Sequence, residues 1–131
     1  MVRGIGVDII EIDRIREVID RQGDRFIDKV FTAVEIAYCR ARKIPYQHFA
    51  ARFAAKEAVA KALSTGWRGE FRWKDIEVSN NELGQPSVTL HGAISERLAG
   101  SRIFLSLSHS DNSVVAFVVI ETDPVPGEPG R

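Results

Sequence analysis

The sequence has a single cysteine, no net charge and no long apolar run. Because Cys39 is alone among 131 residues, an internal disulfide bond and a cysteine-based zinc cluster are excluded, and a reducing, cytoplasmic location is predicted. Eighteen basic residues balance eighteen acidic ones, so nothing attracts the whole protein to nucleic acid or to a membrane surface. The most apolar run, residues 114–120, is too short to span a bilayer. We therefore predict neither a nucleic-acid partner nor a membrane partner.

The common nucleotide-binding signatures are also missing, since neither GxGxxG nor a Walker glycine loop occurs. What is present is a composition of 44% hydrophobic and 27% charged residues, which predicts one globular domain with one core. We assign this domain to residues 1–121. Residues 122–131 show no periodicity and predict a disordered tail.

Hydrophobic periodicity predicts helices in the first half of the chain and hairpins in the second. A strand over 4–12 precedes a helix that Asp13 would cap and Gly23 would end. Further elements are predicted as helices over about 24–43, 49–63 and 92–99, and as strands over 71–78, 87–90, 102–109 and 113–120. The last strand is apolar on both faces, so we expect helices to cover one face and another subunit to cover the other.

Asp8 lies in the middle of the first strand, on the face that it shares with Gly4 and Gly6. Glycine inside a strand marks the close approach of a ligand or of another backbone, which predicts room in front of the carboxylate. The alternative is that Asp8 begins a turn or caps the next helix, a position for which Asp13 is better placed.

Glu57 and Lys61 lie one turn apart in the alanine-rich stretch RFAAKEAVAKAL, residues 52–63. On a helix Glu57 would share an inward face with Phe53, Ala60 and Lys61. The alternative is an exposed pair worth a few tenths of a kcal/mol. Two carboxylates on separate elements, each beside small residues, are typical of a site for Mg²⁺ or Mn²⁺ with a phosphate-bearing substrate.

The middle of the chain is strongly basic. Between residues 36 and 66 only Glu57 opposes six cations, namely Arg40, Arg42, Lys43, Arg52, Lys56 and Lys61. This charge predicts an anion site in which an arginine grips a terminal phosphate, or alternatively a solvated basic face. Charges of both signs alternate over residues 14–28, as on an exposed helix that docks an acidic partner.

The three histidines differ in their sequence context. His109 ends the strand LSLSH beside Ser106 and Ser108, where it is a candidate base or phosphate ligand, although a lone histidine is more often an ordinary surface residue. His48 and His91 have no companions in the sequence that indicate a site.

Five segments together closely resemble the holo-acyl-carrier-protein synthases, the small bacterial phosphopantetheinyl transferases. They are GIGVDIIEIDRI, the glutamate of FTAVE (Glu35), RFAAKEAVAKAL, ELGQP and SLSHSDNSVVAFVVIE, in order between Gly4 and Glu121. The resemblance implies an α+β fold, with a small antiparallel sheet packed on a long helix. It also implies transfer of the 4′-phosphopantetheine of coenzyme A to a serine of acyl carrier protein, from either a fatty-acid or a polyketide system.

The resemblance further implies roles for individual residues. Asp8 and Glu57 would bind Mg²⁺, and Glu57, Lys61 and His109 would act in catalysis. Coenzyme A would be bound by Arg52, Lys61, Ser64, Gly66, Pro86 and His109. The acidic carrier would dock on Arg14, Arg21 and Arg25, and the protein would be a homotrimer with its sites between subunits.

One position departs from the family pattern. Many relatives carry a histidine where this chain has Phe104, so Glu57, His109 or a water on the metal must serve as the base. Two other functions remain open from the residues alone. A binding module for acidic proteins or nucleic acid would show steep salt dependence without a need for metal, and a phosphohydrolase would cleave coenzyme A without a carrier.

Overall fold

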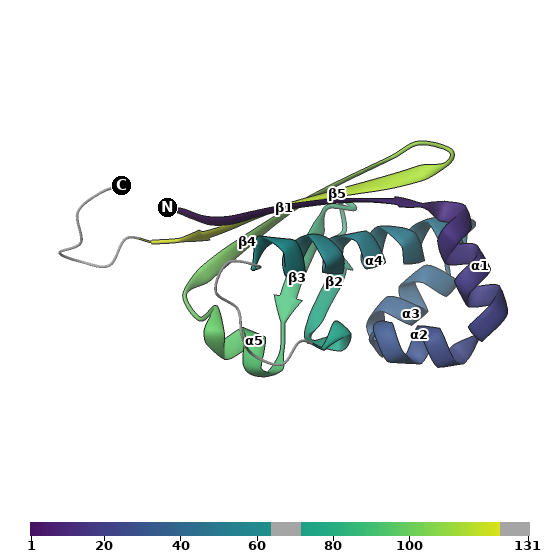
Figure 1. Ribbon diagram of the computed structural model, residues 1–131, viewed down its shortest axis with the longest axis horizontal. Helices are drawn as coiled ribbons and strands as arrows, with labels where there is room; N and C mark the ends of the chain where they lie inside the picture. Colours follow the sequence, from purple (N-terminus) through teal and green to yellow (C-terminus); the bar gives the residue numbers. More distant parts are fainter. Residues whose placement is uncertain (64–71, 124–131) are drawn as a thin grey trace.

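The computed structural model describes residues 1–63 and 72–123 and gives them an α+β fold. The elements are β1 (Val2–Glu11), α1 (Ile12–Gln22), α2 (Asp24–Val30), α3 (Ala33–Arg40), α4 (Pro45–Ala62), the 3₁₀ turn η1 (Trp73–Asp75), β2 (Ile76–Asn80), β3 (Pro86–Leu90), α5 (Gly92–Arg97), β4 (Ser101–His109) and β5 (Ser113–Thr122). An antiparallel sheet in the order β1-β5-β4 covers one side of α4, and the hairpin β2-β3 packs elsewhere on the same helix (Figure 1). The predicted small antiparallel sheet on a long helix is confirmed.

The predicted helix over 24–43 is two helices, because the chain leaves the helical conformation at Phe31 and Thr32. Thr32 has extended backbone angles, and its hydroxyl accepts a hydrogen bond from the amide of Glu35 at 3.2 Å. The Glu35 carboxylate accepts in return from the Thr32 amide at 2.9 Å. This reciprocal capping box starts α3 and explains the break.

Other boundaries differ from the prediction for local reasons. Helix α4 begins at Pro45, because proline is well suited to the first helical position, where its missing amide hydrogen costs nothing. Helix α1 is preceded by Glu11 and has no side-chain cap, so the predicted cap at Asp13 is wrong. Asp13 lies in the first turn and pairs with Arg16 at 3.2 Å.

The second half of the chain follows the predicted hairpins with shifted ends. The 3₁₀ turn η1 precedes β2, so this strand starts at Ile76 and not at residue 71, a position outside the described residues. Strand β5 extends to Thr122, and the Asp123 carboxylate accepts a hydrogen bond from Arg102 at 2.9 Å. Residues 124–131 of the predicted tail lie outside the described residues.

Strand β1 lies unusually close to α4, at two glycines. A Cβ atom added at Gly6 would lie 1.9 Å from the carbonyl oxygen of Ala58, and one added at Gly4 would lie 2.2 Å from that of Ala62. At residues 4 and 6 the glycines therefore admit the backbone of α4, which is one of the two causes expected for glycine inside a strand.

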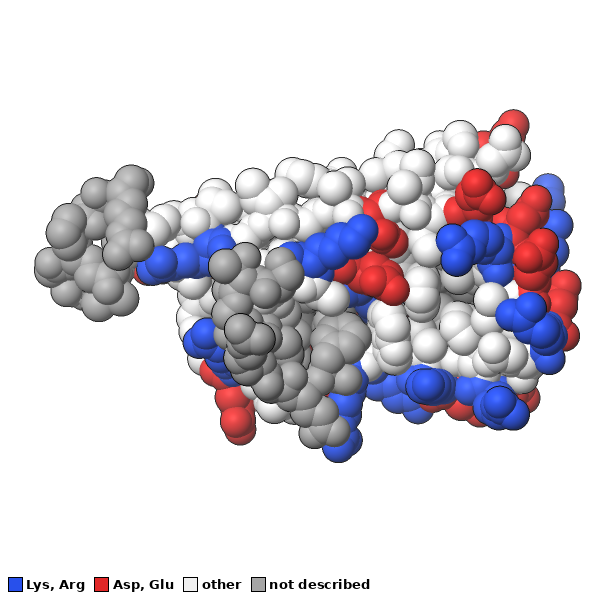
Figure 2. Space-filling model, viewed as in Figure 1, with Lys and Arg blue, Asp and Glu red and all other residues white. Residues whose placement is uncertain are grey.

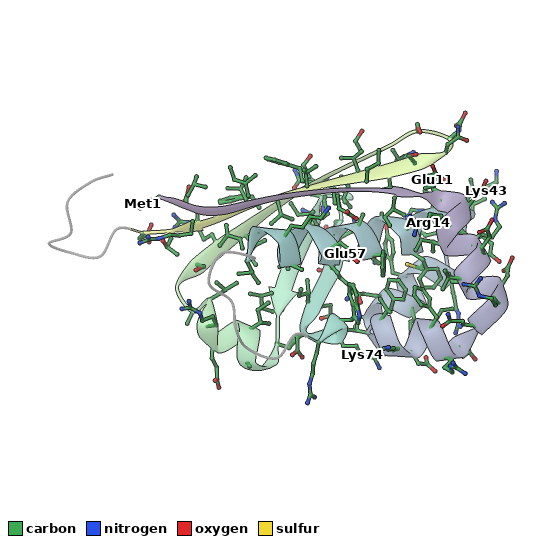
Figure 3. All side chains as sticks on the ribbon, in the orientation of Figure 1. Met1, Glu11, Arg14, Lys43, Glu57 and Lys74 are labelled. Atoms are coloured by element: carbon green, nitrogen blue, oxygen red, sulfur yellow. The ribbon has the colours of Figure 1, made fainter. Side chains whose placement is uncertain are left out.

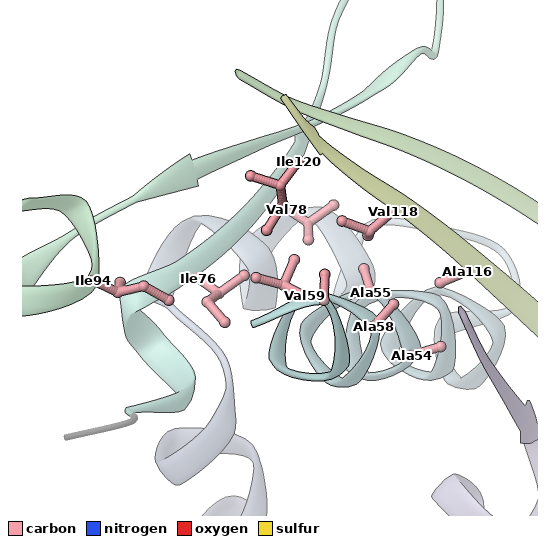
Figure 4. Close-up of a cluster of buried hydrophobic side chains, with 11 residues drawn as sticks. Ala54, Ala55, Ala58, Val59, Ile76, Val78, Ile94, Ala116, Val118 and Ile120 are labelled. Carbon is pink, nitrogen blue, oxygen red and sulfur yellow. The ribbon is translucent and has the colours of Figure 1, made fainter. Parts of the chain in front are cut away.

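The core lies between the sheet and α4. Val59 of the helix packs with Ile76 and Val78 of β2 and with Val118 and Ile120 of β5, while alanines on α4 keep the layers close (Figure 4). A second cluster joins α1, α2 and α3 to the N-terminal half of α4. Within the described residues, no helix has the length and apolar character needed to cross a membrane.

The outer face of the sheet is apolar and exposed in the single subunit. It carries side chains from all three strands that are between 43% and 66% exposed, namely Ile5, Val7, Ile9, Phe104 and Phe117. The inner face of β5 is buried on α4, as predicted, and the expected second subunit on the outer face stays a prediction.

The contact between β1 and α4 can be tested with Gly6→Ala. We expect the substitution to lower the free energy of unfolding by roughly 3 kcal/mol, because the new methyl group meets a backbone oxygen that cannot move aside. Chemical denaturation measures the change. The control is Thr89→Ala, at an exposed position of β3, which should stay within about 0.5 kcal/mol of the wild type. Equal stability of Gly6→Ala and the control would contradict the close contact.

Candidate active site

Asp8, Glu57 and Lys61 gather where β1 crosses α4. The Lys61 ammonium lies 2.8 Å from one oxygen of Asp8 and also donates to the carbonyl oxygen of Val7 at 3.2 Å. The Asp8 side chain is only 14% exposed, whereas that of Lys61 is 54% exposed. Figure 2 shows a small acidic patch next to a basic side chain in the middle of this face, and Figure 3 labels Glu57 in front of α4. Residues 8 and 57, far apart in sequence, are neighbours in the fold.

Electrostatic coupling ties these three side chains together. Partial burial raises the pKa of Glu57, the charge of Asp8 raises it further, and Lys61 acts in the opposite direction. The hydrogen bond from Lys61 to Asp8 is the main cause of a raised pKa of Lys61, with support from the charges of Asp8 and Glu57. The carboxylates of Asp8 and Glu57 therefore share the single positive charge of Lys61, which leaves an excess of negative charge at this position.

The acidic pair suits a hard divalent cation. The second carboxylate oxygen of Asp8 is buried and has no hydrogen-bond partner, an arrangement that is costly unless a ligand satisfies it. Among the described residues, no group of three or more histidine, cysteine or acidic side chains is arranged so that it could hold a metal ion. A cation held by Asp8 and Glu57 would thus keep most of its coordination positions for water and substrate oxygens, as Mg²⁺ prefers.

Arg52 lies on the other flank of α4. Glu57 is five positions after Arg52 on the helix, so the two point about 140° apart around the helix axis. Arg52 is 2% exposed and lines a pocket of about 190 Å³ with His48, Asn80, Gly84 and His109. One terminal nitrogen of its guanidinium donates to the side-chain oxygen of Asn80 at 2.8 Å, while its Nε is buried without a partner.

The acidic pair and the Arg52 pocket are apart within one subunit. Ala116 pairs with Asp8 on one side and with Leu107 on the other, which puts Asp8 and Leu107 about 10 Å apart across the sheet. His109 lies two residues beyond Leu107, at the end of β4. His109 and Arg52 thus line one pocket, which lies apart from Asp8 of the same chain.

The predicted basic surface is wrong at Lys56, whose side chain is fully buried. Its ammonium pairs with the Glu35 carboxylate at 2.9 Å, donates to the carbonyl oxygen of Trp73 at 2.9 Å and also donates to that of Ile76. The other Glu35 oxygen accepts from the amide of Val78 at 2.8 Å. Burial lowers the pKa of Lys56 and the Glu35 charge opposes this effect, so the pair joins α3, α4 and β2 rather than binding phosphate.

The remaining predicted positions have diverse settings. Ser64 and Gly66 lie outside the described residues. Pro86 pairs with Asn80 at the edge of the Arg52 pocket. Phe104, the position that departs from the family pattern described above, lies on the exposed outer face of the sheet.

The three arginines predicted to dock the carrier are exposed. Arg14 and Arg21 are seven residues apart on α1 and share a face, and Arg25 lies in α2. Figure 2 shows acidic and basic side chains mixed over this end of the molecule.

Sequence reasoning missed His48 and Tyr38. His48 lines the Arg52 pocket, and the Tyr38 ring lies 4.1 Å from the guanidinium carbon of Arg52. The spacing of four residues between His48 and Arg52 was a signal, because it puts both on one face of a helix. Nothing in the sequence indicates that Tyr38 stacks on an arginine from another helix.

Comparison with known proteins identifies the family of this chain. Residues 4–118 match the model of the 4′-phosphopantetheinyl transferase superfamily. The chain belongs to this superfamily. Its holo-acyl-carrier-protein synthase relatives include one from Clostridium acetobutylicum, which is 48% identical over 124 residues, covering 92% of this chain and 98% of the relative.

Solved structures of phosphopantetheinyl transferases have the same fold. The holo-acyl-carrier-protein synthase of Neisseria meningitidis superposes with a TM-score of 0.84 at 37% identity, covering 93% of this chain and all of the other. The enzyme from Bacillus anthracis, described as a complex with CoA (3′,5′-ADP), gives 0.78 at 36% identity over 94% and 99% of the two chains. The family resemblance of the sequence is thereby confirmed.

For this phosphopantetheinyl transferase, two lysines on α4 provide a matched test of burial. Lys56→Met should lower the free energy of unfolding by about 3–5 kcal/mol, because it leaves the Glu35 charge buried without its partner. Lys61→Met, on the exposed flank, should change it far less. Urea denaturation of both variants measures the difference. Similar losses in the two variants would contradict a structural role for Lys56.

Proposed function

We propose that the chain transfers the 4′-phosphopantetheine group of coenzyme A to a serine of apo acyl carrier protein and releases adenosine 3′,5′-bisphosphate. The observation that carries this conclusion is the meeting of Asp8 and Glu57 beside Lys61 in a member of the phosphopantetheinyl transferase superfamily. The relatives named as holo-acyl-carrier-protein synthases support the choice of acceptor, and the complex of the Bacillus anthracis enzyme supports the choice of donor. The single cysteine continues to predict a cytoplasmic protein.

Glu57 is the proposed general base. The carrier serine oxygen attacks the pantetheine-side phosphorus, the bond from that phosphorus to the bridging oxygen breaks, and the serine proton passes to Glu57. Burial and the charge of Asp8 raise the pKa of Glu57 in the absence of a cation. A cation on the carboxylate would oppose this shift, so the base role falls to a carboxylate oxygen that does not bind the ion. His109 is the second candidate, but it lies away from Glu57 within the subunit. A base role for His109 would therefore require a neighbouring subunit.

Asp8 and Glu57 are the proposed ligands of Mg²⁺. When bound, the ion supplies positive charge that neutralises the diphosphate of coenzyme A. The orphaned oxygen of Asp8 supports this assignment. Lys61 adds a second positive charge on the exposed side, where a diphosphate can reach it. We expect the pair to bind and orient the donor, so that positioning supplies much of the rate.

The Arg52 pocket is the proposed site of the terminal 3′-phosphate. Arg52 has an unpartnered N–H there, and His109 lies beside it. Coenzyme A carries this phosphate and the diphosphate on one molecule, whereas one subunit holds the two sites on opposite flanks of α4. We therefore propose a homotrimer in which the pocket of one subunit faces the acidic pair of the next, with the apolar outer sheet faces buried in the assembly.

Arg14, Arg21 and Arg25 are the proposed docking residues for the acidic carrier. Their exposure and their places at one end of the molecule support this assignment. Exposed cations on a partner surface raise the rate of encounter with an acidic protein and make it sensitive to salt.

Transfer is tested by mass spectrometry of apo carrier incubated with the protein, coenzyme A and saturating Mg²⁺. We expect the carrier to gain the mass of one phosphopantetheine group. Asp8→Asn and Glu57→Gln should each slow the transfer about a hundredfold or more, because each removes a carboxylate from the reacting centre. Glu96→Gln, on exposed α5, is the matched control and should keep the wild-type rate.

Two results of this assay would count against the proposal. Cleavage of coenzyme A without any carrier would indicate a hydrolase, and near-normal rates in both carboxylate variants would exclude the metal site at Asp8 and Glu57.

The proposal that each active site is formed by two neighbouring subunits is tested by mixing two inactive variants. Glu57→Gln disables the acidic pair, and His109→Glu puts a negative charge into the pocket. Chains mixed in equal amounts and reassembled should regain about a quarter of the wild-type rate, because one site in four combines two intact halves. Mixing Glu57→Gln with Asp8→Asn should restore no transfer activity, since both substitutions lie in the acidic pair. Sedimentation measures the expected trimer, and no recovery in the first mixture would place each site within one chain.

A further inference from the structure

The pocket around Arg52 contains a histidine that the proposed reaction does not use. His48 lies one helical turn before Arg52 on α4, and both line the pocket with His109 from β4. Asn80 and Gly84 of the β2-β3 hairpin close another side. The described residues that line this pocket include no aspartate and no glutamate.

Arg52 makes the pocket suitable for an anion. Its guanidinium is almost completely buried, with one N–H group that has no acceptor. The Tyr38 ring holds it from one side, and the guanidinium carbon of Arg42 lies 4.2 Å from the centroid of the same ring. Because an unpaired buried donor is costly, an acceptor that enters the pocket gains the hydrogen bond that the protein does not supply.

His48 is held beside this guanidinium. Its ring meets the Tyr38 ring edge-on, with 5.7 Å between centroids. Partial burial lowers the pKa of His48, and the positive charges of Arg52, Arg42 and His109 lower it further. The charged and titratable groups that face His48 are thus Tyr38 and Arg42 from the α3 side, Arg52 from α4 and His109 from β4. These effects favour the neutral form of the imidazole when no anion is bound.

We propose that His48 is a further phosphate-binding residue of the Arg52 pocket and that it binds the phosphate as an imidazolium, so that a phosphate monoester takes up a proton when it enters. The identity of the ligand as the 3′-phosphate of coenzyme A rests on the proposed function. The proton uptake rests on the pocket itself, because a dianion placed among these groups reverses the local potential that keeps His48 neutral.

Proton uptake makes binding weaken as pH rises. Between the pKa of His48 in the empty pocket, below 6.5, and its higher value with phosphate bound, the dissociation constant rises by up to about tenfold per pH unit. The second ionisation of the phosphate, near pH 6, has the opposite effect and is nearly complete above pH 7. Measurements between about pH 7 and 8 therefore isolate the contribution of the histidine.

Calorimetry of adenosine 3′,5′-bisphosphate binding tests the proposal with the complete protein. Titrations at pH 7 in buffers of different ionisation enthalpy count the protons taken up. The wild type should take up a substantial fraction of one proton. His48→Gln and His48→Phe should lose this uptake and bind several-fold more weakly, and the phenylalanine variant keeps an aromatic contact with Tyr38. His91→Gln removes a histidine outside the pocket and should behave as the wild type.

Adenosine 5′-phosphate, which lacks the 3′-phosphate, should bind without this proton uptake. No uptake by the wild type, uptake unchanged in both His48 variants, or equal uptake with the two nucleotides would each overturn the proposal. Because calorimetry needs no carrier, failure of phosphopantetheine transfer with intact proton-linked binding would reject the proposed function and leave this inference standing. Normal transfer without proton uptake would overturn this inference and leave the proposed function standing.

Discussion

The contact between the backbones of β1 and α4 is the constraint on which the acidic site depends. Gly4 and Gly6 have no side chain, so the strand can rest against the carbonyl oxygens of Ala62 and Ala58. Asp8 lies two residues further along β1, on the same face. It forms an ion pair with Lys61 and interacts electrostatically with Glu57. Moving the strand outward by the width of a methyl group would move the Asp8 carboxylate away from both partners. Small residues on two elements therefore set the distance between two carboxylates.

The ion pair between Lys56 and Glu35 holds the other side of α4 in place. Lys56, which directly precedes Glu57, points into the core and holds Glu35, together with the carbonyl oxygens of Trp73 and Ile76. This pair anchors α4 to α3 and β2, and Asn80 at the end of β2 in turn reaches Arg52. Adjacent residues in the sequence thus serve separate purposes, because successive side chains on a helix point about 100° apart. Lys56 maintains the fold, and Glu57 is partly exposed beside Asp8.

This division explains what the sequence could predict and what it could not. The alternating pattern around Asp8 and the spacing of Glu57 and Lys61 are local, and the structure brings these residues together as predicted. The burial of Arg52 and Lys56 is not local, since it depends on which face of α4 the hairpin and α3 cover. A count of cations along residues 36–66 could not separate a buried lysine from an exposed one. The break at Thr32 was visible as the pattern T-x-x-E, but helical periodicity on both sides concealed it.

The two flanks also explain why an assembly is needed for the proposed reaction. A single subunit exposes an acidic pair on one side of α4, a cationic pocket on the other, and an apolar sheet face that is left open to water. Each feature is costly alone: the pair carries excess negative charge, the Nε group of Arg52 lacks an acceptor, and exposed aliphatic and aromatic side chains favour association. Joining copies through the sheet would bury the apolar face and would leave the two charged surfaces able to share one ligand. In the proposed function, a donor with a diphosphate at one end and a phosphate at the other would satisfy both surfaces, because the pocket would supply donors to the terminal phosphate while a cation at the acidic pair would neutralise the diphosphate.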